Sequence, residues 1–487
     1  MHDGTSPASR HTLGVFALAM MNVAAVMSLR GLPMMAKEGL TMIFYILFAA
    51  VLFLVPVSLV SAELATGWPK EGGVYRWVRE AFGERWGFTA IWLQWIQNVI
   101  WYPTVLAFAA GCLSYLFLDP VLADNKYFNV AVILVVYWGA TLANFQGMKT
   151  AGWLTTAGVL GGTLFPAALI IILGLLWTFT GNPLEVLKTS HSVIPDFGSF
   201  QNISFLAGII LLFAGMEVGA VHVTELKNLK TGYPKAVFLA MFIIIATFTL
   251  GSLAIASVLP EAQISLTAGI MQAFKDLLGK FGLGWFLPVL GFLAAFGTVG
   301  GVVAWLAGPS KGLLATAKEG ELPPFMQHTN KKGVQTHILI VQGVIVTLIS
   351  LVYVIMPNVS AAFFLLTALT ATLYLIMYAM LYASAIRLRY LQPNVERAYR
   401  VPGGNAGMWL TAGVGMAAVV FAFVVGFFPP AQLAVGSPAF YVIFLIVGTM
   451  AFLCAPFVIA KFKKPNWRPR AQPAVVGDAG RCGGRWR

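Results

Sequence analysis

Charged side chains are scarce in this chain. Only 10% of its 487 residues are Asp, Glu, Lys or Arg, whereas soluble domains carry about a quarter. Hydrophobic residues make up 59% of the chain and the mean hydropathy is +0.82. Together these values predict a polytopic membrane protein. The first apolar run is too long for a signal-peptide core and lacks a small-residue cleavage site, so we expect it to be the first membrane span.

Cysteine and histidine are also rare, and their scarcity argues against several functions. The three cysteines, Cys112, Cys454 and Cys482, show neither a pairing pattern nor metal-ligand spacing, and the six histidines are scattered. The chain also lacks a recognisable nucleophile–base pair or nucleotide-binding loop. We therefore expect no enzyme activity, no bound metal and no cofactor.

Twelve apolar segments are long enough to cross a bilayer, which takes about 20 residues each. The distribution of basic residues tests this topology. With a cytoplasmic N-terminus, 25 of the 31 Lys and Arg residues lie in inner segments, five lie in outer segments, and Arg30 lies within a span. This asymmetry predicts that both termini are cytoplasmic. The predicted spans are 12–36, 40–64, 86–118, 127–146, 152–180, 203–224, 235–259, 285–316, 335–357, 360–386, 408–428 and 439–461.

The segments between and beyond the spans have their own character. Residues 68–87 are amphipathic and basic, and residues 266–279 predict a short external helix. Residues 1–11 form a cytoplasmic N-terminus. Residues 462–487 are basic and rich in Pro and Gly, so we expect a disordered tail. The net charge of +13 therefore predicts contact with a bilayer whose inner leaflet is anionic, and no nucleic-acid partner.

Two spans contain signals that interrupt a helix. The first span holds Met27-Ser28-Leu29-Arg30-Gly31-Leu32-Pro33, and the sixth holds Gly215 and Gly219 on either side of Glu217. Unwound helices at corresponding positions of two halves point to a binding site in transporters, because they expose backbone polar groups to a cavity. The spacing of five spans predicts two repeats, 12–180 and 203–388, followed by two further spans within 408–461.

Arg30 and Glu217 are opposite charges within apolar spans, where an unpaired charge is costly. They either form an ion pair that holds the two breaks together, or one or both contact a substrate, or Glu217 exchanges a proton. Glu63 lies at the inner end of span two, where the membrane interface can hydrate it.

Further candidates lie on spans three, eight and ten. Trp305 either forms a wall of the cavity or packs against lipid and neighbouring helices. Tyr374 and Tyr378 lie one turn apart near the middle of span ten, and a polar lining explains this position better than an interfacial belt. Span three carries a polar stripe that suits either a pathway or helix–helix contacts; its members are Gln94, Gln97 and Asn98.

These features resemble the APC superfamily of amino acid permeases and, more narrowly, the bacterial glutamate/γ-aminobutyrate antiporter family. The matching stretches are EGGVYRWV (71–78), RWGFTAIWLQWIQ (85–97), GMEVGAVHVTELKN (215–228), SLTAGIMQAF (265–274), AWLAGPSKGLLATAKEGELPP (304–324) and RVPGG (400–404). The resemblance implies an all-α polytopic protein of the bacterial inner membrane, with 12 transmembrane helices. Two inverted five-helix repeats, in which helices 1 and 6 are broken, would be followed by two helices. Glu217, Trp305, Tyr374 and Tyr378 match family positions in the central site.

Three departures from the family pattern bear on mechanism. The family's acid-resistance member has a tyrosine-rich stretch before the first-span proline, where this chain has Ser28-Leu29-Arg30-Gly31-Leu32. Only about two dozen residues follow span twelve, so an acid-gated C-terminal plug is not expected. Thr156 stands where that member carries a lysine, and the absence of an evident Ser/Thr pair in span eight favours exchange or proton coupling over sodium coupling.

The sequence thus predicts a secondary transporter of small-molecule amino acid substrates, either an antiporter or a proton-coupled permease, acting by alternating access as a monomer or homodimer. An uptake permease for neutral amino acids or an amine is the alternative. A non-transporting sensor or an ion channel fits less well, because the tail is too short for a signalling domain and no continuous polar pore is evident. The predicted substrate-binding residues are Met27, Ser28, Leu29, Arg30, Gly31, Gly215, Glu217, Trp305, Tyr374 and Tyr378.

Overall fold

The protein is described by a computed structural model covering residues 14–69, 72–189, 192–220 and 229–468. Over these residues the chain forms helices and loops, without a β-strand. The polytopic class predicted from composition and the all-α class implied by the family resemblance are both confirmed. The predicted N-terminal segment 1–11 lies outside the described residues.

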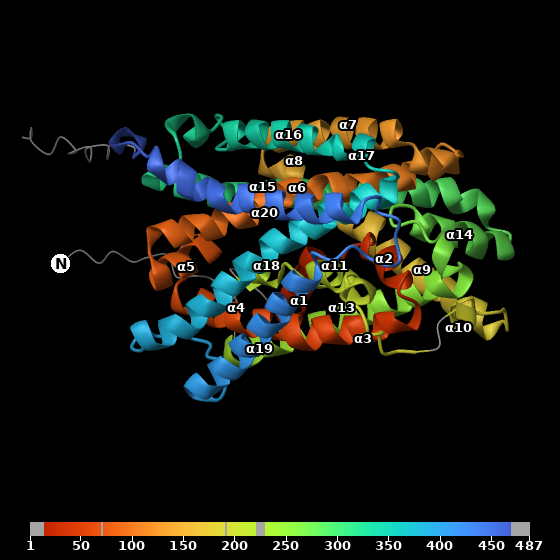
Figure 1. Cartoon of the computed structure of the whole chain (residues 1–487), viewed down its shortest axis with the longest axis horizontal. Coiled ribbons are helices and arrows are strands. Elements are labelled where there is room, and N and C mark those ends of the chain that lie inside the picture. The colour runs from red at the N-terminus through yellow and green to blue at the C-terminus, as the bar shows by residue number, and fades with distance from the viewer. Residues whose placement is uncertain (1–13, 70–71, 190–191, 221–228, 469–487) are drawn as a thin grey trace, which may run out of the picture.

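Twenty α-helices are present in these described ranges, and they pack into a bundle (Figure 1). The α-helices are α1 (Val15–Val26), α2 (Gly31–Ala36), α3 (Met42–Ala49), α4 (Val55–Gly67), α5 (Val74–Phe82), α6 (Glu84–Leu116), α7 (Lys126–Phe145), α8 (Met148–Ala157), α9 (Phe165–Phe179), α10 (Val186–Thr189), α11 (Phe205–Leu212), α12 (Met216–Ala220), α13 (Leu229–Val258), α14 (Gly269–Lys280), α15 (Leu287–Thr316), α16 (Thr336–Ser350), α17 (Val352–Ile355), α18 (Val359–Leu391), α19 (Gly404–Val425) and α20 (Pro438–Lys461). Shorter π-helical and 3-10 segments are η1 (Gly39–Thr41), η2 (Ala50–Leu54), η3 (Pro120–Asp124), η4 (Gly158–Leu164), η5 (Phe200–Ile203), η7 (Glu261–Gln263), η8 (Gly284–Phe286), η9 (Ala317–Glu321), η10 (Pro324–Gln327) and η11 (Pro465–Trp467).

Eleven helical stretches of the described chain are long and apolar enough to cross a membrane. The first predicted span is absent from this set because it is divided into α1 and α2, neither of which is long enough alone. Eleven long spans and one broken span agree with the twelve spans predicted from hydropathy. The short helix predicted at 266–279 is observed as α14, and the amphipathic segment forms α5.

The helices differ in how deeply they are buried in the bundle. Of the most apolar window of each helix, 83% is buried in α6 and 89% in α18, against 17% in α20. The two central helices therefore form the core, and α20 presents most of its apolar surface outward, as a lipid-facing helix does. In Figure 1, α5 and α14 lie at opposite ends of the bundle, and these ends are named after them below.

Glu63 at the α5 end is not hydrated, contrary to the expectation from sequence. Its side chain is 2% exposed and accepts two hydrogen bonds from Arg389 of α18, at 2.5 and 2.6 Å. The backbone N–H of Val401 donates a further bond of 2.7 Å. Because a buried carboxylate is stable only when paired and hydrogen-bonded, this network joins α4, α18 and the loop before α19 at one point.

The beginning of the predicted disordered tail is also ordered. Lys463 pairs with Glu321 of η9 at 2.5 Å, and Gln327 donates a 2.7 Å hydrogen bond to the backbone carbonyl of Trp467. Trp467 is buried, and Arg468 Nε donates to the carbonyl oxygen of Glu319. Residues 462–468 therefore pack against the α5 end, whereas 469–487 lie outside the described residues.

The fifth span crosses α15 at very short range. An added Cβ on Gly162 in η4 would lie 2.3 Å from both Gly297 N and Leu293 O, whereas one on Gly161 would have nothing within 4 Å. Small residues permit such contacts between membrane helices. The crossing fixes η4 against α15, and both elements contribute residues to the cavity described below.

We expect Gly162→Ala to destabilise the protein, because the methyl group would overlap the backbone of α15. Overpacking of this kind costs about 1–3 kcal/mol. The thermal unfolding midpoint in detergent should fall for Gly162→Ala and stay near the parent value for the matched control Gly161→Ala. Equal midpoints for the two variants would show that the helices do not cross at this residue.

Candidate substrate-binding site

The first membrane span is interrupted between Val26 and Gly31. Pro33 explains the position, because a proline ring in a continuous helix would clash with the carbonyl of Leu29, four residues earlier. Met27 adopts an extended conformation, with ψ of 127°. The backbone N–H groups of Ser28, Leu29 and Arg30 donate no hydrogen bond within the described chain. The break therefore supplies three neighbouring unsatisfied donors.

The sixth span is interrupted between Leu212 and Met216. Gly215 has φ of +123°, a conformation that side chains with a Cβ rarely adopt. Its N–H donates to the hydroxyl of Tyr378 at 3.1 Å, and an added Cβ would lie 3.1 Å from the carbonyl oxygen of Ala25. The two breaks therefore face each other, as the sequence pattern predicts.

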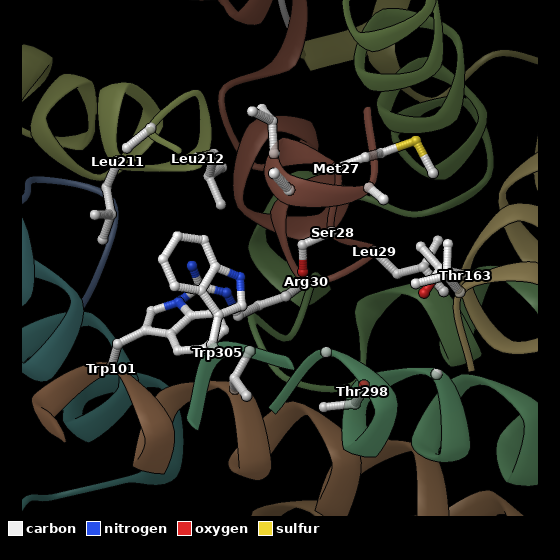
Figure 2. A pocket seen from close by; sticks show the side chains of 18 of the residues that line it. Met27, Ser28, Leu29, Arg30, Trp101, Thr163, Leu211, Leu212, Thr298 and Trp305 are labelled. Atoms are coloured by element: carbon white, nitrogen blue, oxygen red, sulfur yellow. The ribbon is translucent and has the colours of Figure 1, made fainter. Parts of the chain in front are cut away.

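A cavity of about 90 Å³ lies at the first break. Figure 2 shows Arg30 extending from the break toward Trp101 and Trp305. The remaining wall comes mainly from α6, η4, α11 and α15, and α18 contributes Tyr374. The polar or aromatic lining residues are Ser28, Arg30, Gln97, Asn98, Trp101, Thr163, Thr298, Trp305 and Tyr374.

The structure places the predicted substrate-binding residues in two groups. Six of them line the cavity: Met27, Ser28, Leu29, Arg30, Trp305 and Tyr374. The other four lie behind the wall: Gly31, Gly215, Glu217 and Tyr378. Gly31 is a packing position, since an added Cβ would lie 2.9 Å from the side chain of Leu212.

Arg30 is buried, but its guanidinium makes few polar contacts within the described chain. The residue is only 3% exposed. Its Nη1 donates one hydrogen bond of 2.9 Å to the hydroxyl of Thr104. The guanidinium carbon lies 5.7 Å from the ring centroids of both Trp101 and Phe363. Nε has no hydrogen-bond partner. Aromatic faces stabilise a cation, yet no carboxylate of the described chain pairs with this one.

Glu217 has other partners, so the ion pair considered from the sequence is not present. Its carboxylate accepts hydrogen bonds from the hydroxyls of Tyr374 and Tyr378, the latter at 2.6 Å, and from Gln94 at 3.4 Å. No ion pair joins Arg30 to Glu217 in the part of the chain that the structure describes. Glu217 instead ties α12 to α18 and α6.

Several lining residues escaped prediction or remained ambiguous. The amides of Gln97 and Asn98 both donate to the backbone carbonyl of Gln94, and both side chains line the cavity. Two of the three residues of the polar stripe of α6 thus line the cavity, and the third, Gln94, contacts Glu217 instead. Thr163 and Thr298 were not predicted, because isolated threonines in membrane helices usually hydrogen-bond their own helix. Within the described residues, no cluster of His, Cys, Asp or Glu is suited to a metal ion.

Comparison with known proteins identifies the class of protein to which this site belongs. Residues 13–452 match the amino acid permease family. The chain is 43% identical to an uncharacterized transporter of Legionella pneumophila, over 93% of this chain and 97% of the relative. It is 32% identical to a glutamate/gamma-aminobutyrate antiporter of Lactococcus lactis, over 96% of each. A probable agmatine/putrescine antiporter of the same species is 25% identical, over 76% of this chain and 78% of the relative.

These matches extend over both helix breaks and every helix that lines the cavity. They agree with the expectation of a transporter and not of an enzyme. The chain belongs to the amino acid permease family and is a multi-pass membrane transporter with small-molecule amino acid substrates.

Proposed function

We propose that this protein exchanges an amino acid carrying an anionic side chain, of the glutamate type, for a second amino acid. The observation that carries the proposal is Arg30, a buried cation at the cavity wall with one hydrogen bond and no acidic partner in the described chain. A cation in this position is stabilised when an anion enters. The likeness to glutamate/gamma-aminobutyrate antiporters supports the same substrate class.

The site offers a place for each charged group of such a substrate. The unsatisfied amides of Ser28 and Leu29, with that of Arg30, would bind the α-carboxylate. The Arg30 guanidinium would bind the side-chain carboxylate, because its planar fork matches a carboxylate. Backbone carbonyls at the end of α1 would accept from the amine. Trp101 and Trp305, whose ring centroids are 6.0 Å apart, would enclose the aliphatic part.

Exchange requires the site to face the two sides of the membrane in turn. The two breaks lie on spans one and six, which supports two inverted repeats of five spans, at 12–180 and 203–388. The Glu217 carboxylate, held by Tyr374 and Tyr378, would fasten the sixth span to α18 in one of the two states. The excess of basic residues in alternate segments supports cytoplasmic termini, so the α14 end would face outward.

An amine substrate is the main competing possibility, and it is named for relatives that include the probable agmatine/putrescine antiporter. Arg30 disfavours it here, because a buried guanidinium repels a substrate with a net positive charge. Counterflow in proteoliposomes with a panel of glutamate, glutamine, γ-aminobutyrate and putrescine separates these classes. Strong competition by putrescine and none by glutamate would overturn the proposal.

Replacing Arg30 should selectively weaken transport of the anionic substrate. Hydrogen bonds to charged groups contribute about 1.5–3 kcal/mol, so Arg30→Gln should raise KM for glutamate about 10- to 100-fold. KM for glutamine should change little. Thr104→Val, which removes the Arg30 partner but keeps the charge, is the matched control and should have the smaller effect on glutamate. Equal losses for glutamate and glutamine in Arg30→Gln would assign Arg30 a purely structural role.

Double-mutant cycles can test whether Glu217 is coupled to its tyrosine partners, as the structure shows, or to Arg30, as an ion pair would require. Coupling between directly bonded residues runs from about 0.5 to 3 kcal/mol. We expect Glu217→Gln with Tyr378→Phe to show coupling in this range, measured by thermal unfolding. Glu217→Gln with Arg30→Gln should show the weaker coupling, since the two side chains share no partner. A stronger coupling of Glu217 with Arg30 than with Tyr378 would contradict the structure and favour the ion pair.

A further inference from the structure

A second polar cluster lies away from the cavity, where α2 meets the loops of the α14 end. Glu38 lies two residues after the end of α2 and is 7% exposed. Its Oε2 accepts a 3.4 Å hydrogen bond from Gln432, in the loop before α20, while its Oε1 is buried and has no partner among the residues that the structure describes. A buried carboxylate oxygen without a donor is unfavourable when ionised and tolerable when it carries a proton.

The charged and titratable neighbours of Glu38 come from three elements. Lys37 precedes it, Glu261 approaches from η7, and Tyr45 approaches from α3. The Lys37 ammonium is directed to backbone carbonyls, those of Glu261 at 3.1 Å and Ile264 at 3.4 Å, and forms no ion pair with Glu38. Burial, reinforced by the charge of Glu261, raises the pKa of Glu38 to about 8.

These contacts hold the end of α2 against the neighbouring loops and α14. Lys37 fastens its end to the segment 261–264, and Gln432 bridges Glu38 to the backbone carbonyl of Asn202 at the beginning of the sixth span. Pro33 packs so closely on Gly269 of α14 that an added Cβ there would lie 2.9 Å away. Opening the cavity toward this end has to separate α2 from these elements, and that separation admits water to Glu38.

We propose that Glu38 is a proton-binding site separate from the substrate cavity, and that its proton is released when α2 moves away from the loops at the α14 end. The two sites are joined by α2 itself, since Arg30 precedes this helix and Glu38 lies two residues beyond it. When α2 is packed against these loops (the closed form), Glu38 keeps the proton, because its Oε1 has no hydrogen-bond donor within the described chain. When α2 has moved away (the open form), Glu38 releases the proton, because water then solvates the carboxylate.

The sign of the pH dependence follows from this difference. A hydrated Glu has a pKa near its ordinary value of about 4.3, and the closed form has a pKa of about 8. Between these two values only the closed form binds the proton, so raising the pH favours opening by up to about tenfold per pH unit. Above about pH 8 the dependence should level off, since both forms are then ionised.

Cysteine labelling in detergent tests this site without using any substrate. The parent carries Ala36→Cys, at the buried end of α2, in a background of Cys112→Ala, Cys454→Ser and Cys482→Ser. The labelling rate by a small polar thiol reagent, corrected for thiolate formation with a free-thiol standard, should rise with pH and level off near pH 8. Adding Glu38→Gln should abolish this rise, because glutamine keeps the volume but cannot release a proton.

Two further variants make the result specific. Glu261→Gln should move the midpoint to lower pH, because it removes a negative charge that raises the pKa of Glu38. Asp119→Asn, an exposed carboxylate in the loop between α6 and α7, is the matched control and should reproduce the parent curve. A Glu38→Gln protein that elutes as a single species yet keeps the parent pH curve would overturn the proposal.

A companion measurement links the proton site to transport and keeps it distinct from the proposed substrate. The exchange rate in proteoliposomes should depend on pH in the parent and lose the dependence below pH 8 in Glu38→Gln. If glutamate is not transported but labelling still follows Glu38, the substrate assignment fails and the proton site stands. If glutamate is exchanged and neither readout responds to Glu38→Gln, the proton site fails alone.

Discussion

The requirement that backbone polar groups find partners inside a membrane governs this structure. A helix meets the requirement internally, so a break is tolerated only where other helices and a polar cavity surround it. Here α6 and α18, two of the most buried spans, lie against the breaks of the first and sixth spans. Tyr378 of α18 accepts from the amide of Gly215, so a neighbouring side chain replaces one lost helical hydrogen bond. The amides of Ser28, Leu29 and Arg30 have no partner within the described chain, which is why we propose them as ligands of the substrate.

Arg30 and Glu217, the charges near the two helix breaks, have contrasting surroundings. Glu217 is surrounded by donors and is in effect part of the framework that joins α12 to α18. Arg30 is surrounded by aromatic faces and a single hydroxyl, which stabilise a cation without neutralising it. Pairing the two residues would have satisfied both, and would also have removed the positive charge from the cavity. Their separation therefore keeps the site electrostatically open to an anion.

Much of the fold could be predicted because its signals are local or compositional. Hydropathy gave the spans, Pro33 marked the first break, and Gly215 marked the second, each for a backbone reason contained in a few residues. The partners of buried charges could not be predicted in this way. Arg30 bonds Thr104, 74 residues away, and Glu63 bonds Arg389, 326 residues away. Such choices depend on how helices pack. Likewise, the order of residues 462–468 follows from Lys463 meeting Glu321, a contact between distant segments whose composition alone indicated disorder.

The short helix α2 connects Arg30, which precedes it, with Glu38, which lies two residues after it. It has only six residues, all buried, and is too short to bend independently of its ends. A displacement that moves Glu38 out of its contacts with Gln432 must therefore be felt at Arg30, and an anion drawn to Arg30 must act back on the contacts of Glu38. Reciprocity of this kind is a thermodynamic necessity once both sites bias the same two states. An α-helix that continued unbroken through residues 27–30 would carry the whole first span with it, including α1. In the proposed mechanism the break thus has two effects, since it exposes the amides that bind substrate and confines the moving element to one end of the span.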